Sequence, residues 1–135
     1  MIVLEFSSLV LMERDKETNF FVKELGSYEV GDGASYVTKF YYDGDKVNMF
    51  FDTNRDVEEW EYSAIYDLFN LEAFEKAGFT IEEVDDEYNP TWALKFNYIE
   101  DHNEMTEKIN IACELIEDEI EKVSNDIKGK EDSYK

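Results

Sequence analysis

The sequence predicts an α+β fold in which an antiparallel sheet, made of a four-stranded N-terminal meander and two later strands, packs with two central helices and a long C-terminal amphipathic helix. Three observations support this prediction. Strand-like runs rich in β-branched and aromatic residues fill the first 51 residues, and apolar residues then recur with a helical period of about 3.6. The strand-rich and helix-rich blocks are also segregated along the chain, which favours α+β over a parallel α/β sheet.

The chain is long enough to bury one hydrophobic core. Its 135 residues fit a single domain, and aromatic residues make up 16% of them, far more than a disordered acidic chain contains. We assign residues 1–128 to one α+β domain. Residues 129–135 are expected to form a polar C-terminal tail that frays.

Four strands are expected in the N-terminal half, at residues 2–12, 20–30, 35–42 and 46–51. Gly26 interrupts the second of these runs as a bulge or bend would. The stretch Gly31-Asp32-Gly33 is typical of a turn, because these residues tolerate positive φ. Asp43-Gly44 lies between two aromatic-rich runs and is the clearest hairpin signal in the chain.

The first helix is expected to begin at Asp56. Its carboxylate can accept hydrogen bonds from the free N–H groups of the first turn, and Glu59 three residues later would complete a capping box. Asn70 is placed to cap a second, short helix. Gly78 would end that helix, because glycine is the usual residue after a helix C-terminus.

Two later strands and a long helix complete the predicted fold. The strands are expected at residues 79–84 and 91–99, and the helix at residues 103–127. An apolar stripe follows the helix at spacings of three and four, formed by Met105, Ile109, Ala112, Ile116, Ile120, Val123 and Ile127. Ile111 and Leu115 widen this stripe on one flank.

The segment DTNRDVEEWE, residues 52–61, resembles the start of a calcium loop because oxygen-bearing side chains alternate at Asp52, Asn54 and Asp56. An EF-hand loop also needs Gly at its sixth position and Glu at its twelfth. Val57 and Ser63 occupy those positions here. The segment is therefore interpreted as the start of a helix, and we expect no metal or cofactor.

Residues suited to nucleophilic catalysis are scarce. His102 is the only histidine and lies at a strand-to-helix junction, where Asp101 or Asn103 is a natural helix cap. Cys113 is the only cysteine and falls near the apolar stripe, eleven residues from His102. On one helix that separation is ~16 Å, too far for proton transfer. We expect the protein not to be an enzyme.

The chain carries 34 acidic and 13 basic residues, a net charge of −21. Phosphates of nucleic acids and anionic membranes should repel it, so neither is an expected partner. A single cysteine favours a reducing compartment, and the apolar N-terminal run is too short to span a bilayer. We therefore expect a cytoplasmic protein.

We expect the protein to act by binding another protein, and a basic partner would suit an acidic face on the last helix. Helical neighbours three and four residues apart lie roughly 5–6 Å from one another, similar to the spacing of successive phosphates in a nucleic acid strand. The candidate residues are Glu107, Glu114, Asp118 and Glu121, with Glu82, Glu83, Asp85, Asp86 and Glu87 in the preceding loop. The simpler interpretation is a solvated surface that serves solubility.

Three alternative functions stay open. The protein could be a phosphate-mimicking inhibitor of a basic nucleic-acid-binding protein, or an acidic chaperone or immunity-like partner. It could also be a carboxylate-based enzyme, because sequence does not show whether two of its many carboxyl groups share a pocket.

Aromatic residues at successive strand positions suggest self-association. Neighbours on a strand point to opposite faces of the sheet, so Phe40-Tyr41-Tyr42 and Phe50-Phe51 place rings on both faces. Together with the flank at Ile111 and Leu115, this is more apolar surface than one helix layer covers. We expect a homodimer.

Four segments give the chain a resemblance to a family of short acidic bacterial proteins that carry only an uncharacterised-domain label. They are KELGSYEV, FDTNRDVEEWEYSAIYDLFNLEAFE, YNPTW and IKGKE. The resemblance covers nearly the whole length and implies a cytoplasmic bacterial protein. It implies no known activity and no functional residues.

Overall fold

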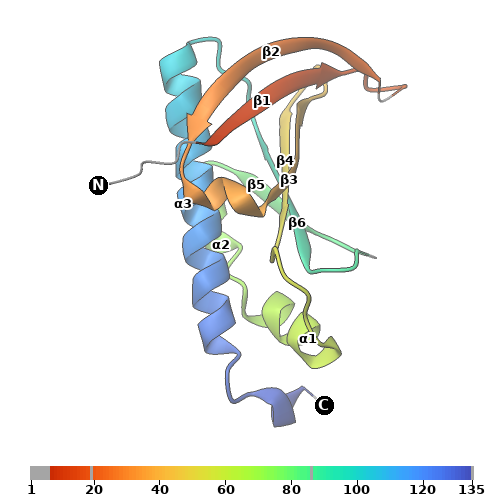
Figure 1. Ribbon diagram of the computed structural model, residues 1–135, viewed down its shortest axis with the longest axis vertical. Helices are drawn as coiled ribbons and strands as arrows, with labels where there is room; N and C mark the ends of the chain where they lie inside the picture. Colours follow the sequence, from red (N-terminus) through yellow and green to blue (C-terminus); the bar gives the residue numbers. More distant parts are fainter. Residues whose placement is uncertain (1–6, 19, 86, 135) are drawn as a thin grey trace.

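The computed structural model describes residues 7–18, 20–85 and 87–134 and has the predicted α+β architecture (Figure 1). Its elements are β1 (Ser7–Arg14), β2 (Phe21–Val30), the 3-10 helix η1 (Asp32–Tyr36), β3 (Val37–Tyr42), β4 (Val47–Asp52), α1 (Glu59–Leu68), α2 (Glu72–Lys76), β5 (Thr80–Val84), β6 (Thr91–Phe96), α3 (His102–Asp126) and the 3-10 helix η2 (Glu131–Ser133). Residues 2–6 of the first expected strand lie outside the described residues. The fold class is confirmed.

The first four strands do not form the expected meander. The sheet has the order β2-β1-β3-β4-β6-β5, so β1 lies between β2 and β3. It runs antiparallel to β2 and parallel to β3, where Met12 pairs with Tyr41. The reason is η1, which occupies the place of the expected Gly31–Gly33 turn. This helix carries the chain past β1 instead of returning it beside β2.

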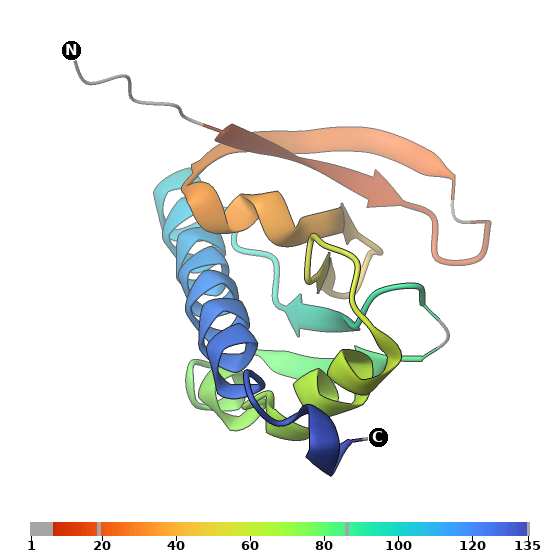
Figure 2. The same cartoon turned by 60° about the horizontal axis from the view of Figure 1, so that its bottom comes forward.

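The core lies between one face of the sheet and the helices, with α3 running alongside (Figures 1 and 2). All seven residues of the predicted α3 stripe are buried. The core also contains an aromatic cluster. The Trp92 ring stacks on the rings of Phe51 and Phe69 at centroid distances of 5.3 and 4.2 Å. Ile111 is 45% exposed and does not join the core.

The opposite face of the sheet is lined with aromatic rings and cations. Phe50 stacks with Tyr41 at a centroid distance of 6.3 Å. The guanidinium group of Arg14 lies 4.7 Å from the centre of the Tyr41 ring, and the ammonium group of Lys39 lies 5.4 Å from that of Phe50. Aromatic rings therefore occur on both faces, as predicted, and on this face the chain's own cations pack on them.

Local turn signals are largely confirmed. Gly44 has φ +90 in the β3–β4 hairpin, and Gly78 has φ +92 immediately after α2 and its C-cap Ala77. The register between β1 and β2 shifts beside Gly26, as expected for a bulge. Asp101 caps α3 by accepting a hydrogen bond of 2.9 Å from the Glu104 N–H.

Two predicted helix caps are wrong. The first helix begins at Glu59 with Glu58 as its cap residue, not at Asp56, because the Glu61 carboxylate accepts the backbone N–H of Glu58 at 3.0 Å. Asn70 does not cap α2, which begins after Leu71. The backbone N–H of Asn70 instead donates a hydrogen bond of 2.8 Å to the buried carboxylate of Glu119 on α3.

The stretch Gly31–Gly33, expected to form a turn, leads into η1 without positive φ at its glycines. Positive φ occurs among the described glycines at Gly44, Gly78 and Gly129, not at Gly33. Glycine is needed at position 33 for a different reason. A Cβ atom there would lie 2.1 Å from the backbone oxygen of Cys113, so only glycine lets η1 approach α3 this closely.

Candidate functional site

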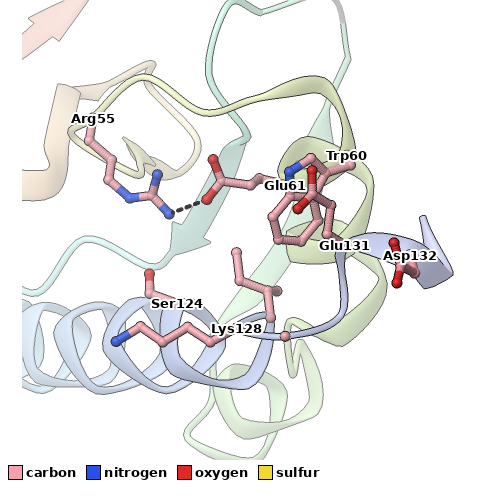
Figure 3. Close-up of a pocket in the computed structure, with 9 residues that line it drawn as sticks. Arg55, Trp60, Glu61, Ser124, Lys128, Glu131 and Asp132 are labelled. Carbon is pink, nitrogen blue, oxygen red and sulfur yellow. Dashed lines mark hydrogen bonds and ion pairs between the residues drawn. The ribbon is translucent and has the colours of Figure 1, made fainter. Parts of the chain in front are cut away.

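A hollow lies where the start of α1 meets the end of α3 (Figure 3). It has a volume of about 620 Å³. Its lining comes from the β4–α1 loop, the first turn of α1, the last turn of α3 and the segment after it, and comprises Arg55, Trp60, Glu61, Ser124, Ile127, Lys128, Gly129, Glu131 and Asp132.

A second hollow of about 500 Å³ lies beside the first. Its lining is Glu58, Glu59, Trp60, Ser63 and Tyr134. Trp60 lines both hollows, and its side chain is half-buried. We call the two hollows together the Trp60 site.

The first turn of α1 holds the indole in place. The Trp60 Nε1–H group donates a hydrogen bond of 2.7 Å to the Glu58 carboxylate two residues earlier. This bond satisfies the indole donor. The other tryptophan, Trp92, is fully buried, so Trp60 is the one that a ligand could reach.

An ion pair forms one wall of the first hollow. The Arg55 guanidinium lies 3.1 Å from the Glu61 carboxylate, and its other terminal nitrogen donates to the Asp56 carbonyl at 3.2 Å. The backbone N–H of Glu58, followed by Arg55, holds the pKa of Glu61 below its ordinary value. Glu61 therefore stays ionised and helix α1 keeps its cap.

The segment after α3 forms the other wall. Gly129 has φ +80 and turns the chain after α3, so that η2 follows it (Figure 2). The Tyr134 hydroxyl then donates a hydrogen bond of 2.6 Å to Asp67 of α1, which raises the pKa of Tyr134. Residues 129–134, for which a frayed tail was expected, thus run beside α1 and contribute four of the lining residues.

The charge around the indole is mainly negative. Five acidic residues line the Trp60 site, namely Glu58, Glu59, Glu61, Glu131 and Asp132, against the two basic residues Arg55 and Lys128. Arg55 is paired with Glu61, and the Lys128 ammonium donates to the Asn125 side chain at 3.1 Å. An aromatic face flanked by carboxylates suits a cationic side chain, which the ring attracts through its quadrupole.

The acidic residues expected on the last helix do share one exposed side. Glu107, Glu114, Asp118 and Glu121 are all exposed on the side of α3 away from its buried stripe. Helical spacing puts the four residues in a line along the helix, as predicted.

The acidic residues of the β5–β6 hairpin lie elsewhere. Glu82, Glu83, Asp85 and Glu87 are exposed, but the hairpin loop lies at the far end of the strands from α3 in both views (Figures 1 and 2). Glu82 pairs with Lys95 at 3.6 Å, and the Glu87 carbonyl accepts the Tyr62 hydroxyl at 2.9 Å. Asp86 lies outside the described residues. The expected acidic face is therefore divided into two separate surfaces.

The residues considered for catalysis or metal binding have structural contacts. The His102 ring stacks on Tyr28 at 5.0 Å, and its Nε2 atom lies 3.1 Å from the Ser27 carbonyl. Burial raises the pKa of Cys113 to about 12. Asp52 accepts the Asn54 N–H at 2.8 Å in a tight turn. Within the described part of the chain, no three His, Cys, Asp or Glu side chains are grouped to hold a metal ion.

Sequence reasoning missed the Trp60 site because its parts are far apart in the chain. No sequence pattern marks Trp60, Arg55, Lys128 or Tyr134 as parts of one site. The only available signal was the resemblance, since the segments FDTNRDVEEWEYSAIYDLFNLEAFE and IKGKE both contribute residues to the first hollow.

Fold and site together define a small α+β protein with an acid-flanked aromatic hollow. The chain belongs to the family of unknown function DUF6762, whose model matches residues 4–135. No curated protein and no solved structure matches it. Among the residues that the structure describes, no helix has both the length and the apolar character needed to cross a membrane.

Proposed function

We propose that this protein is a non-enzymatic binding protein whose partner presents a basic segment to the Trp60 site. The observation that supports the proposal most directly is the position of the indole. Trp60 lines both hollows, and their lining also contains five carboxylates. Such a site suits a lysine or arginine side chain of a partner protein.

The expected contact has an apolar and a charged component. The methylene stem of a lysine or arginine would pack on Trp60, which lines both hollows. Its charged end would then meet Glu131 and Asp132, or Glu58 and Glu59 in the second hollow. A cation over an aromatic ring contributes about 0.5–2 kcal/mol, depending on how far it is desolvated.

The net charge of the whole chain favours the same class of partner. A charge of −21 attracts basic proteins over distances beyond direct contact and speeds their association. This long-range effect gives no specificity by itself. The Trp60 site would supply the specificity, because a shaped aromatic hollow accepts a positioned side chain rather than positive charge in general.

The contacts of the reactive side chains support a non-enzymatic role. Cys113 is 2% exposed, and its raised pKa keeps the thiol protonated at neutral pH. His102 is stacked on Tyr28 next to the Ser27 carbonyl, where it fastens α3 to β2. Neither residue lines the Trp60 site.

One observation favours a second candidate, a phosphate-mimicking inhibitor of a basic nucleic-acid-binding protein. The four acidic residues on the outer side of α3 are exposed and aligned. Mimicry would use this outer side of α3 and would not require Trp60. The two candidates therefore predict different effects of mutations on the two surfaces.

Two matched triple variants distinguish these candidates. The first replaces Glu59 and Glu131 by Gln and Asp132 by Asn, in the Trp60 site. The second replaces Glu107 and Glu114 by Gln and Asp118 by Asn, on the outer side of α3. Each variant removes three negative charges from residues of the same types, so both have the same net charge.

Calorimetric titration with a Lys/Arg-rich peptide at low salt, with an acidic peptide of equal length as control, provides the test. The proposal predicts that the first variant binds the basic peptide at least about tenfold more weakly, equivalent to 1.4 kcal/mol, while the second binds nearly as the wild type does. Loss of binding only in the second variant would support mimicry. Equal, small losses of affinity in both variants would mean that only the net charge of the protein attracts the peptide, and this would contradict a specific site.

A further inference from the structure

The strand β2 has a free edge along half of its length. It is the first strand of the sheet order and, among the described residues, pairs only with β1. Helix α3 covers the other half of this edge. The Ser27 carbonyl lies 3.1 Å from His102 Nε2, and the Glu29 carbonyl accepts the Asn110 side-chain amide at 2.9 Å.

The uncovered half, together with Phe20 just before it, carries the most exposed apolar run among the described residues. Phe20, Phe21 and Val22 are 74%, 60% and 57% exposed. Lys23 and Glu24 follow and are also exposed. An exposed edge strand with apolar side chains is a template on which another strand can pair through its backbone groups.

The distribution of charge indicates that a second copy of the chain pairs with this edge. The chain carries −21 overall, so two copies repel each other across most of their surfaces. The segment from Phe20 to Tyr28 contains one lysine and one glutamate and has no net charge. A second copy can therefore approach here without the repulsion that it meets elsewhere, whereas nothing in this neutral segment attracts the basic partner proposed for the Trp60 site.

We propose that two copies of this chain associate by antiparallel pairing of their β2 edges at residues 20–24. Under two-fold symmetry the residue on the axis faces its own copy. Lys23 or Glu24 on the axis would place like charges opposite each other, which is unfavourable. Val22 on the axis avoids this, and it places Lys23 opposite the partner's Phe21 and Glu24 opposite the partner's Phe20.

The proposed interface differs from the surfaces on which the homodimer was expected from sequence. On the outer face of the sheet Tyr41 and Phe50 pack with Arg14 and Lys39 of the same chain and are partly buried, whereas Phe21, whose ring centre also lies 4.6 Å from the Arg14 guanidinium, stays 60% exposed. The flank at Ile111 and Leu115 lies on α3, whose exposed side is strongly acidic. The β2 edge combines exposed apolar side chains, unpaired backbone and zero net charge.

Two cysteine variants test where the copies meet. Val22→Cys and Ile111→Cys each introduce one exposed thiol at an apolar position, and the native Cys113 is buried and stays protonated at neutral pH. Mild oxidation of the full chain should give a disulfide-linked dimer with Val22→Cys and little with Ile111→Cys. Cross-linking through Ile111→Cys alone would overturn the proposal.

The charge variant Val22→Lys provides a second test. It places two lysines opposite each other on the axis, yet it lowers the net negative charge of the chain, so a weaker dimer could not be attributed to overall repulsion. Sedimentation equilibrium should show a concentration-dependent dimer for the wild type and a monomer for Val22→Lys, with unchanged circular dichroism. A wild type that stays monomeric at high micromolar concentration, or a Val22→Lys dimer of wild-type strength, would overturn the β2 edge as the interface.

Discussion

The backbone N–H of Asn70 donates a hydrogen bond of 2.8 Å to the carboxylate of Glu119, a charged residue that is only 6% exposed. This bond ties the loop between α1 and α2 to α3. The carboxylate also lies 3.7 Å from the Lys122 ammonium, so the buried charge is partly compensated. The contact holds α1 against α3, the two helices that bound the Trp60 site.

Removing the acceptor at this position should destabilise the fold. Glu119→Leu leaves the Asn70 N–H without its partner, and we expect it to lower the free energy of unfolding by about 1–3 kcal/mol. Glu119→Gln keeps an oxygen that can accept the bond and should cost less. Urea denaturation of both variants measures the difference. Equal stability of wild type and Glu119→Leu would show that the bond contributes nothing.

The close approach of η1 to α3 makes a second prediction. In Gly33→Ala the added methyl would lie 2.1 Å from the Cys113 oxygen, so the two elements must separate. We expect a loss of about 3 kcal/mol in the free energy of unfolding, the upper range for overpacking. Gly31→Ala is the matched control, because no atom lies within 4 Å of its added carbon. Similar thermal midpoints for the two variants would contradict this packing.

The pKa of Glu61 predicts how stability depends on pH. Its folded pKa lies below the ordinary value of 4.5, so its contribution is fully present above that value and is lost as the pH falls through the lower, folded pKa. Glu61→Gln has no charge to lose there. Its stability should therefore decline less steeply than that of the wild type as the solution is acidified below pH 4.5, measured by urea denaturation at a series of pH values. Parallel curves would contradict the prediction.

Cys113 should be unreactive in the folded protein. Burial raises its pKa to about 12, so at neutral pH the thiol is both inaccessible and protonated. A chromogenic disulfide reagent should label it slowly in buffer and rapidly in denaturant. Labelling at the same rate in both conditions would mean that the α3 stripe is open to solvent.

Local and periodic features of the chain were predictable from sequence. The buried stripe of α3 followed from spacings of three and four, because helical geometry places those positions on one face. Gly44 and Gly78 marked a hairpin and a helix end, because each requires positive φ. The start of α1 was harder to locate, since acidic residues at positions 56, 58, 59 and 61 are all chemically able to act as caps.

Long-range relationships were not predictable from sequence. The insertion of β1 between β2 and β3 depends on η1 packing on α3, and no local pattern encodes that contact. The Trp60 site depends on the chain turning at Gly129 and returning beside α1. The acidic residues are difficult to interpret for a different reason. They are so abundant that sequence spacing did not reveal which of them share a surface.

Emission from Trp60 during titration with a basic peptide tests the central proposal most directly. Trp92 is fully buried, so a ligand in the Trp60 site should change the emission of Trp60 alone. We predict a saturable change on adding a Lys/Arg-rich peptide, which weakens as salt screens the charges and disappears in Trp60→Phe. Calorimetric binding of the peptide to the wild type without any change in this emission, or with unchanged affinity for Trp60→Phe, would contradict the assignment of the Trp60 site as the binding surface.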